Sequence, residues 1–142
     1  MARSAWLYGV GRMSDAAAAL EIASRLDPLG PAVEGLRASL MTARGDIDTA
    51  LEIMQAAWAR WPDSAFIWYL MWSTYCAAGR IDEAEALAAP GAPPRRSVAE
   101  RDIGVLRNYA AMLRLKPEER RDACERLCAH IANGDGPITL ST

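Results

Sequence analysis

A period of 34 residues constrains this chain more than any other feature of its sequence. Four positions follow that step: a glycine, a Met or Ile, a Ser or Asp, and an alanine. They are Gly11, Gly45 and Gly79; Met13, Ile47 and Ile81; Ser14, Asp48 and Asp82; and Ala16, Ala50 and Ala84. Two prolines, Pro28 and Pro62, are also 34 residues apart. A repeat of this length indicates a solenoid of stacked units.

Each repeated residue type has a local role in a pair of helices. Glycine adopts the left-handed conformation that closes a helix. Three residues later Ser14, Asp48 or Asp82 is placed to N-cap the next helix, and Asp82 and Glu85 have the spacing of a capping box. The alanines are small enough for two helices to approach closely, and a proline ends the second helix. The predicted unit is therefore helix, tight turn, helix, turn.

Hydrophobic periodicity supports this unit. Between Ala50 and Trp61 apolar residues recur at three- and four-residue steps, as in an amphipathic helix. Its partner helix is predicted from about Pro31 to Arg44. The segment from Ala65 to Ala78 is almost entirely apolar, so we expect a central helix that is covered on most sides.

The period divides the chain into three units and a remainder. The units are 1–29, which is partial, 30–63 and 64–90. A Pro/Gly-rich break at 91–96 precedes 97–134, a degenerate fourth unit or a capping helical hairpin, and a tail at 135–142. Segment 97–134 is predicted to contain two helices. The first runs from a capping box at Ser97 and Glu100 to about Leu115, and the second runs from Pro117 to Gly134. Such an array is typical of a segment of a longer, bacterial protein.

Composition is that of a globular protein, with 51% hydrophobic and 24% charged residues and a net charge of -2. That charge creates no long-range field for nucleic acid or an anionic membrane. Three cysteines are an odd number, the N-terminus lacks the apolar run of an export signal, and no apolar stretch is long enough to span a membrane. A reduced, cytoplasmic setting with free thiols is expected.

The pattern resembles the tetratricopeptide repeat over roughly residues 1–90. This resemblance implies an all-α fold: a right-handed α-solenoid of helical hairpins, an alpha-alpha superhelix, with a C-terminal helical pair. The repeat-defining residues are Gly11, Ala16, Pro28, Gly45, Ala50, Pro62, Trp68, Tyr75, Gly79 and Ala84. Trp72 and Ala88 depart from the pattern, since the family favours a small and a large residue there. Either the two positions have exchanged sizes, so that the indole of Trp72 fills the space that a large residue at position 88 would take, or the third unit is degenerate.

The same resemblance implies that first helices line a concave groove. Carried over by position, the groove residues are Tyr8, Leu36, Ser39, Thr42, Phe66, Tyr69, Ser73 and Cys76. This surface is aromatic and uncharged, and it lacks the Lys, Arg and Asn with which some family members clamp a C-terminal carboxylate. We therefore expect a scaffold for protein–protein interaction that binds an apolar peptide or helix segment, or the remainder of its own longer chain. A homodimer through exposed solenoid ends is a further expectation.

Catalysis, metals and cofactors are not expected. Cys124 and Cys128 lie four residues apart, but His130, the only histidine, points about 160° away around the helix. Structural zinc requires four ligands, so packed thiols are the simpler interpretation. No nucleophile has a plausible base.

One alternative concerns arginines and a second resemblance. The stretch from Ala23 to Ala38 resembles repeat regions of some bacterial transcription regulators. Arg107, Arg114 and Arg121 recur every seven residues and could contact an anion or nucleic acid. Acidic residues lie between them, which favours a solvated, ion-paired face, and nucleic acid is not the expected partner.

Overall fold

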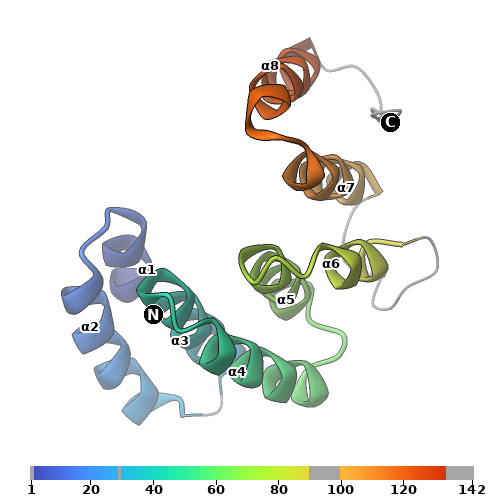
Figure 1. The fold of residues 1–142 in the computed structure, drawn as a ribbon. Coiled ribbons are helices and arrows are strands. Elements are labelled where there is room, and N and C mark those ends of the chain that lie inside the picture. The colour runs from blue at the N-terminus through green and yellow to red at the C-terminus, as the bar shows by residue number, and fades with distance from the viewer. Residues whose placement is uncertain (1, 29, 90–99, 134–142) are drawn as a thin grey trace.

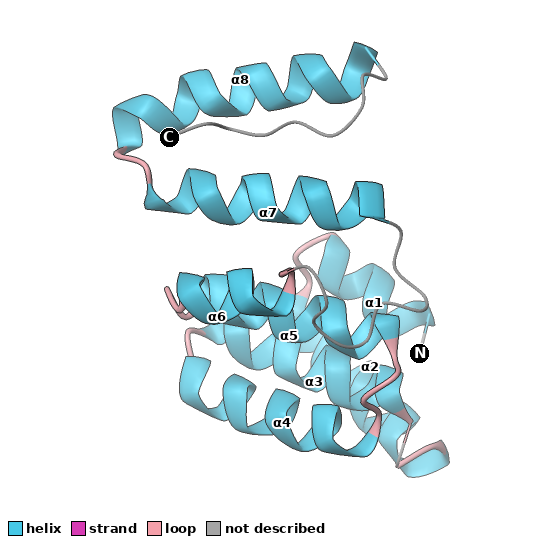
Figure 2. Ribbon diagram, turned by 90° about the vertical axis from the view of Figure 1, so that its right-hand side faces the viewer, coloured by secondary structure: helices cyan, strands magenta, loops and turns pink. Residues whose placement is uncertain are grey.

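The computed structural model describes residues 2–28, 30–89 and 100–133, and the regular secondary structure of these residues is entirely α-helical (Figure 2). The helices are α1 (Ala2–Gly9), α2 (Met13–Leu26), α3 (Pro31–Arg44), α4 (Ile47–Arg60), α5 (Ala65–Ala77), α6 (Ile81–Leu87), α7 (Glu100–Arg114) and α8 (Pro117–Asn133). This is the all-helical repeat that the sequence predicts.

Consecutive helices form hairpins, and the hairpins follow one another along an arc (Figure 1). In the first three hairpins α1, α3 and α5 lie toward the inner side of the arc, whereas α2, α4 and α6 lie on its outer side. The pair α7–α8 continues the row beyond α5 and α6 (Figures 1 and 2). The handedness of the superhelix stays a prediction.

The turn inside each of the first three hairpins has the same backbone geometry. Gly11, Gly45 and Gly79 are left-handed, with φ of 79°, 82° and 70°, which confirms their predicted role. The residue after each glycine also repeats its conformation; it is Arg12, Asp46 or Arg80, with φ from -85° to -83° and ψ from 63° to 70°. Three copies of one turn explain why the glycine recurs.

The predicted N-caps were wrong by two residues. The N-cap positions are occupied by Arg12, Asp46 and Arg80, so Ser14, Asp48 and Asp82 lie inside the first helical turn. The reason is that a single residue separates each left-handed glycine from the next helix. Only Asp46 caps with its side chain, accepting from Thr49 N at 3.4 Å.

Helix ends elsewhere follow the sequence signals. Helix α3 spans the predicted Pro31–Arg44, and α8 begins at Pro117 as expected. Helix α6 ends at Leu87 after only seven residues, as expected from the Pro- and Gly-rich segment that follows. The break at 91–96, Ser97 of the proposed capping box, Gly134 and the tail at 135–142 lie outside the described residues.

The apolar core is a row of clusters, of which three join neighbouring hairpins and a fourth lies between α7 and α8. The first links α1 and α2 to α3, the second links α3 and α4 to α5, and the third links α5 and α6 to α7. The repeated Ala16, Ala50 and Ala84 are fully buried in these clusters. This arrangement is expected of a solenoid, in which each unit contacts only its neighbours.

The pair α7–α8 differs from the first three hairpins. Ala123 is fully buried, like the repeated alanines, but it is the seventh residue of its helix, whereas Ala84 is the fourth. The turn between α7 and α8 contains no glycine. Both differences are compatible with a degenerate fourth unit and with a capping helical hairpin, so the choice between the two stays a prediction.

Candidate functional site

A cavity of about 550 Å³ lies between α5 and α7. It is lined by Tyr69, Trp72, Ser73, Cys76, Ala77, Val105, Leu106, Tyr109 and Leu113. None of these described lining residues carries a formal charge at neutral pH. Three of them, Tyr69, Ser73 and Cys76, are groove residues predicted from the sequence. We call this cavity the α5/α7 groove.

Three aromatic rings, Tyr69 and Trp72 of α5 and Tyr109 of α7, form an aromatic cluster in the groove. Trp72 is almost fully buried. Its ring contacts those of Tyr69 and Tyr109, with distances between ring centroids of 6.3 Å and 5.8 Å, respectively. Tyr69 stacks on the indole at 25°, whereas Tyr109 is tilted by 57°. The two tyrosines remain 49% and 46% exposed. A buried indole thus holds two accessible rings in defined positions.

The hydroxyl of Ser73 in the groove, like that of the neighbouring Thr74, is hydrogen-bonded within α5. The Ser73 and Thr74 hydroxyls both donate to the carbonyl of Leu70, at 2.9 Å and 2.7 Å. The buried Nε1 of Trp72 has no hydrogen-bond partner among the described residues. The surface that the groove offers to a ligand is mostly apolar.

Cys76 lies in the groove as a neutral thiol. Burial raises the pKa of Cys76 to about 11, and the negative charge of Glu85 adds to this increase. A thiol is nucleophilic only as thiolate, so Cys76 is unsuited to catalysis at neutral pH. It contributes apolar, polarisable surface instead.

Contacts at the far side of the groove fix α7 against the third hairpin. Arg107 Nε donates to the carbonyl of Ala88 at 2.6 Å. The Arg114 guanidinium donates hydrogen bonds to the carboxylates of both Asp82 and Glu85 on α6, and the bond to Glu85 is 2.9 Å long. The supposed capping-box residues Asp82 and Glu85 therefore bind a guanidinium of the next helix, and they hold the groove wall in place.

The other predicted groove residues lie elsewhere. Leu36 is a correction, because it is only 7% exposed and packs in the first core cluster. Tyr8 packs against the same cluster. The Ser39 and Thr42 hydroxyls donate to α3 carbonyls at 2.9 Å and 3.0 Å. Phe66 is exposed but does not line the α5/α7 groove.

Sequence reasoning missed the second wall of the groove. Val105, Leu106, Tyr109 and Leu113 all come from α7, beyond the 90 residues to which the repeat pattern was applied. Their three- and four-residue spacing was a visible signal of an amphipathic helix. Without the repeat register, that spacing could not show which way the apolar face points.

The remaining candidates give no second site. Cys124 and Cys128 are exposed, so the expectation of packed thiols was wrong for this pair; a hydrogen bond with Cys128 raises the pKa of the Cys124 thiol. Among the described residues no cluster of His, Cys, Asp and Glu could hold a metal ion. On the arginine face, Arg114 is paired as above and Arg121 lies 4.0 Å from Glu125, which agrees with an ion-paired surface.

Comparison with known proteins bears on the repeat. The sequence model of the tetratricopeptide repeat matches residues 41–100, from the end of α3 to the start of α7. This part of the chain is therefore a tetratricopeptide repeat segment. The matched segment includes Gly45, Ala50, Gly79 and Ala84. No curated protein and no solved structure matches the chain, so nothing here supports the resemblance to transcription regulators.

Family membership carries general expectations. Tetratricopeptide repeats generally mediate protein–protein interactions, and the family is generally non-catalytic. None of the helices in the described part of the chain is long and apolar enough to cross a membrane.

Proposed function

We propose that this protein binds an apolar segment of a partner protein in the α5/α7 groove. The observation that carries the proposal is the aromatic cluster of Tyr69, Trp72 and Tyr109 in a cavity of about 550 Å³ whose described lining residues are uncharged. Tyrosines and tryptophans held in place are efficient contact residues, because little side-chain entropy is lost on binding.

The groove chemistry selects the kind of segment. A C-terminal carboxylate would find no cationic partner among the described lining residues, whereas aromatic or aliphatic side chains would bury their surface against rings and aliphatic groups. The cavity lies between two helices and is partly open to solvent, which is compatible with an extended peptide or one face of a helix. The partner belongs to another protein or to a further part of a longer chain, in a cytoplasmic setting.

Selection from a random peptide library tests the proposal. The full chain would be immobilised, and peptides retained by the wild type would be compared with those retained by Tyr69→Ala. Enriched peptides are expected to contain aromatic or aliphatic residues and to lose affinity tenfold or more for Tyr69→Ala, since hot spots of this type dominate binding. Phe66→Ala, which removes a similarly exposed ring of α5 outside the groove, is the matched control.

The outcome that contradicts the proposal is selection of acidic peptides, or of peptides whose affinity is unchanged by Tyr69→Ala. Circular dichroism of the variant would show that any loss of binding occurs in a folded protein. Because Tyr69 is half exposed, its truncation is expected to leave the helices intact.

A further inference from the structure

The α5/α7 groove presents hydrogen-bond donors that are not used within the described part of the protein. Neither the hydroxyl of Tyr69 nor that of Tyr109 has a hydrogen-bond partner among the described residues, and both tyrosines are about half exposed. The hydroxyl of Ser73, by contrast, already donates to the carbonyl of Leu70. The two tyrosine hydroxyls are therefore free to donate to a ligand that packs against their rings.

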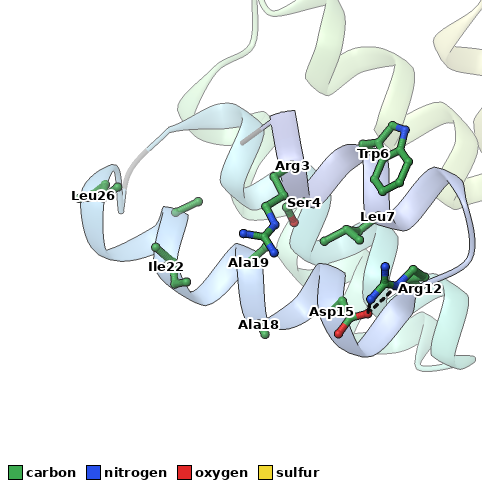
Figure 3. Close-up of a pocket in the computed structure, with 11 residues that line it drawn as sticks. Arg3, Ser4, Trp6, Leu7, Arg12, Asp15, Ala18, Ala19, Ile22 and Leu26 are labelled. Atoms are coloured by element: carbon green, nitrogen blue, oxygen red, sulfur yellow. Dashed lines mark hydrogen bonds and ion pairs between the residues drawn. The ribbon is translucent and has the colours of Figure 1, made fainter.

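A cavity of about 460 Å³ on the first hairpin differs from the groove in this respect (Figure 3). Arg12 and Asp15 lie at one end of it and pair with each other at 2.6 Å. The buried hydroxyl of Ser4 donates to the carbonyl of Ala16 at 2.8 Å. Because these polar groups already have partners inside the protein, they do not indicate the chemistry of a ligand, whereas those of the groove do.

The unused donors constrain the backbone of the ligand. Most backbone carbonyls of a helix already accept from the N–H groups of the same helix. A helix would therefore cover the tyrosine hydroxyls without pairing them, which is unfavourable. An extended segment of ordinary residues has free carbonyls, but it also brings one N–H group per residue. Among the described lining residues there is no carboxylate or side-chain amide to accept from these N–H groups.

Proline satisfies both constraints, because it has a carbonyl but no N–H group. Successive prolines adopt the polyproline II helix, in which the backbone carbonyls form no internal hydrogen bonds and three residues make one turn of ~9 Å. This conformation exists before binding, and it docks well on grooves lined by aromatic rings. Tyr69 and Tyr109 both contact the ring of Trp72, at 6.3 Å and 5.8 Å between centroids, so one turn of such a segment can reach both tyrosines.

We propose that the segment bound in the α5/α7 groove is proline-rich and adopts the polyproline II conformation. Its proline rings pack on the aromatic cluster, and its carbonyls accept hydrogen bonds from the hydroxyls of Tyr69 and Tyr109. This inference rests on the function proposed above and narrows it from an apolar segment of either conformation to one backbone and one residue type.

Isothermal titration calorimetry of the full chain with two blocked ten-residue peptides tests the proposal. The first peptide is PPLPPLPPLP, and the second, AALAALAALA, keeps the leucines and restores the N–H groups. We expect the first to bind at least tenfold more tightly. The double variant Tyr69→Phe/Tyr109→Phe keeps both rings and removes both hydroxyls, so it should weaken binding of the proline peptide about tenfold. Tyr8→Phe, which removes a hydroxyl on the first hairpin, is the matched control and should change nothing.

Two results would overturn the proposal while the function proposed above stands. One is equal binding of the two peptides, or no binding of the proline peptide, when library-selected peptides still depend on Tyr69. The other is full affinity of the double variant for the proline peptide. If Tyr69→Ala weakens binding of no peptide, both proposals fail. Circular dichroism would check the fold of the double variant, and each single Tyr→Phe variant, with an expected loss of a few fold, replaces it if it does not fold.

Discussion

Helix α5 takes part in two junctions that differ in how closely the helices approach. Toward α3 the contact is closed: a Cβ added at Gly35 would overlap Leu70 Cδ1 and lie 2.7 Å from Phe66 Cε1. Toward α7 the contact is open, because the α5/α7 groove lies between the two helices. The rings of Trp72 and Tyr109 connect the helices there. The comparison teaches that the size of one or two side chains at a helix contact decides whether a repeat array has a groove there.

The departure from the repeat pattern explains the open junction. The pattern favours a small residue where this chain has Trp72. The indole of Trp72 is buried in the third cluster, together with Ala88 after α6 and Ile103 of α7. A large side chain at this contact increases the separation of the helices. The small Ala88 in the same cluster agrees with the size-swap interpretation. The groove thus arises where the third repeat deviates.

The largest effect is expected from Trp72→Ala, which removes the buried side chain between α5 and α7. Truncating a buried aromatic residue costs about 3–5 kcal/mol of folding free energy. Urea denaturation followed by circular dichroism would measure it. Phe66→Ala, on the same helix but half exposed, should cost about 1 kcal/mol or less. Equal losses in the two variants would show that Trp72 does not support the open junction.

A smaller effect is expected from adding bulk at the closed junction. Gly35→Leu forces a side chain between α3 and α5, and overpacking typically costs about 1–3 kcal/mol. The better helix propensity of leucine offsets about 1 kcal/mol of this loss. The same residue added at the exposed rim of the groove, Ala77→Leu, should change stability by about 0.5 kcal/mol or less. The comparison fails if Ala77→Leu is as destabilising as Gly35→Leu in the same urea titration.

The attachment of α7 to α6 should respond more weakly to mutation. Arg114→Met removes the cation between Asp82 and Glu85, whose hydrogen bonds and charges raise the pKa of Arg114 above its ordinary value. The site is exposed, so we expect faster amide exchange in α7 and α8, most visible at low salt, with α3 and α4 unchanged. Arg121→Met, at a 4.0 Å pair within α8, is the control. Exchange that is equally fast after both substitutions would contradict this role of Arg114.

The smallest effect on the fold is expected from titration of Cys76. Its pKa is raised to about 11, so iodoacetamide at pH 8 should label Cys76 at least tenfold more slowly than the exposed Cys128. The raised value also has a consequence for stability. The favourable contribution of the protonated thiol is complete below pH 9 and is lost as pH rises toward 11. Rapid labelling of Cys76 at pH 8 would mean that the groove is wetter than described.

The sequence predicted the hairpins well because the information that defines them is local. Gly45 needs a left-handed turn, Pro31 can only begin a helix and the alanine at position 50 must be small, so each residue constrains its own neighbourhood. The same local logic misplaced the N-caps, since a glycine followed by a single linking residue starts the next helix earlier than the Ser or Asp suggests.

The groove was only half predictable because it depends on contacts between distant residues. Tyr69, Ser73 and Cys76, which the repeat positions assigned to a groove, line this cavity, and their role in binding a partner stays a prediction. At the 34-residue step Tyr69 corresponds to Gly35, whereas Leu36 corresponds to Leu70, which does not line the groove; Leu36 is buried in the core. Tyr109 lies in the groove because α7 packs on α6, and no local sequence pattern specifies that packing.

Isothermal titration calorimetry with a library-selected peptide, on Tyr109→Ala and Phe66→Ala, tests the central claim most directly. Both variants lose one half-exposed ring, but only Tyr109 lines the α5/α7 groove. We predict that Tyr109→Ala weakens binding tenfold or more and that Phe66→Ala leaves it unchanged. Unchanged binding by Tyr109→Ala, together with a loss in Phe66→Ala, would place the ligand at the α3/α5 junction and contradict the account.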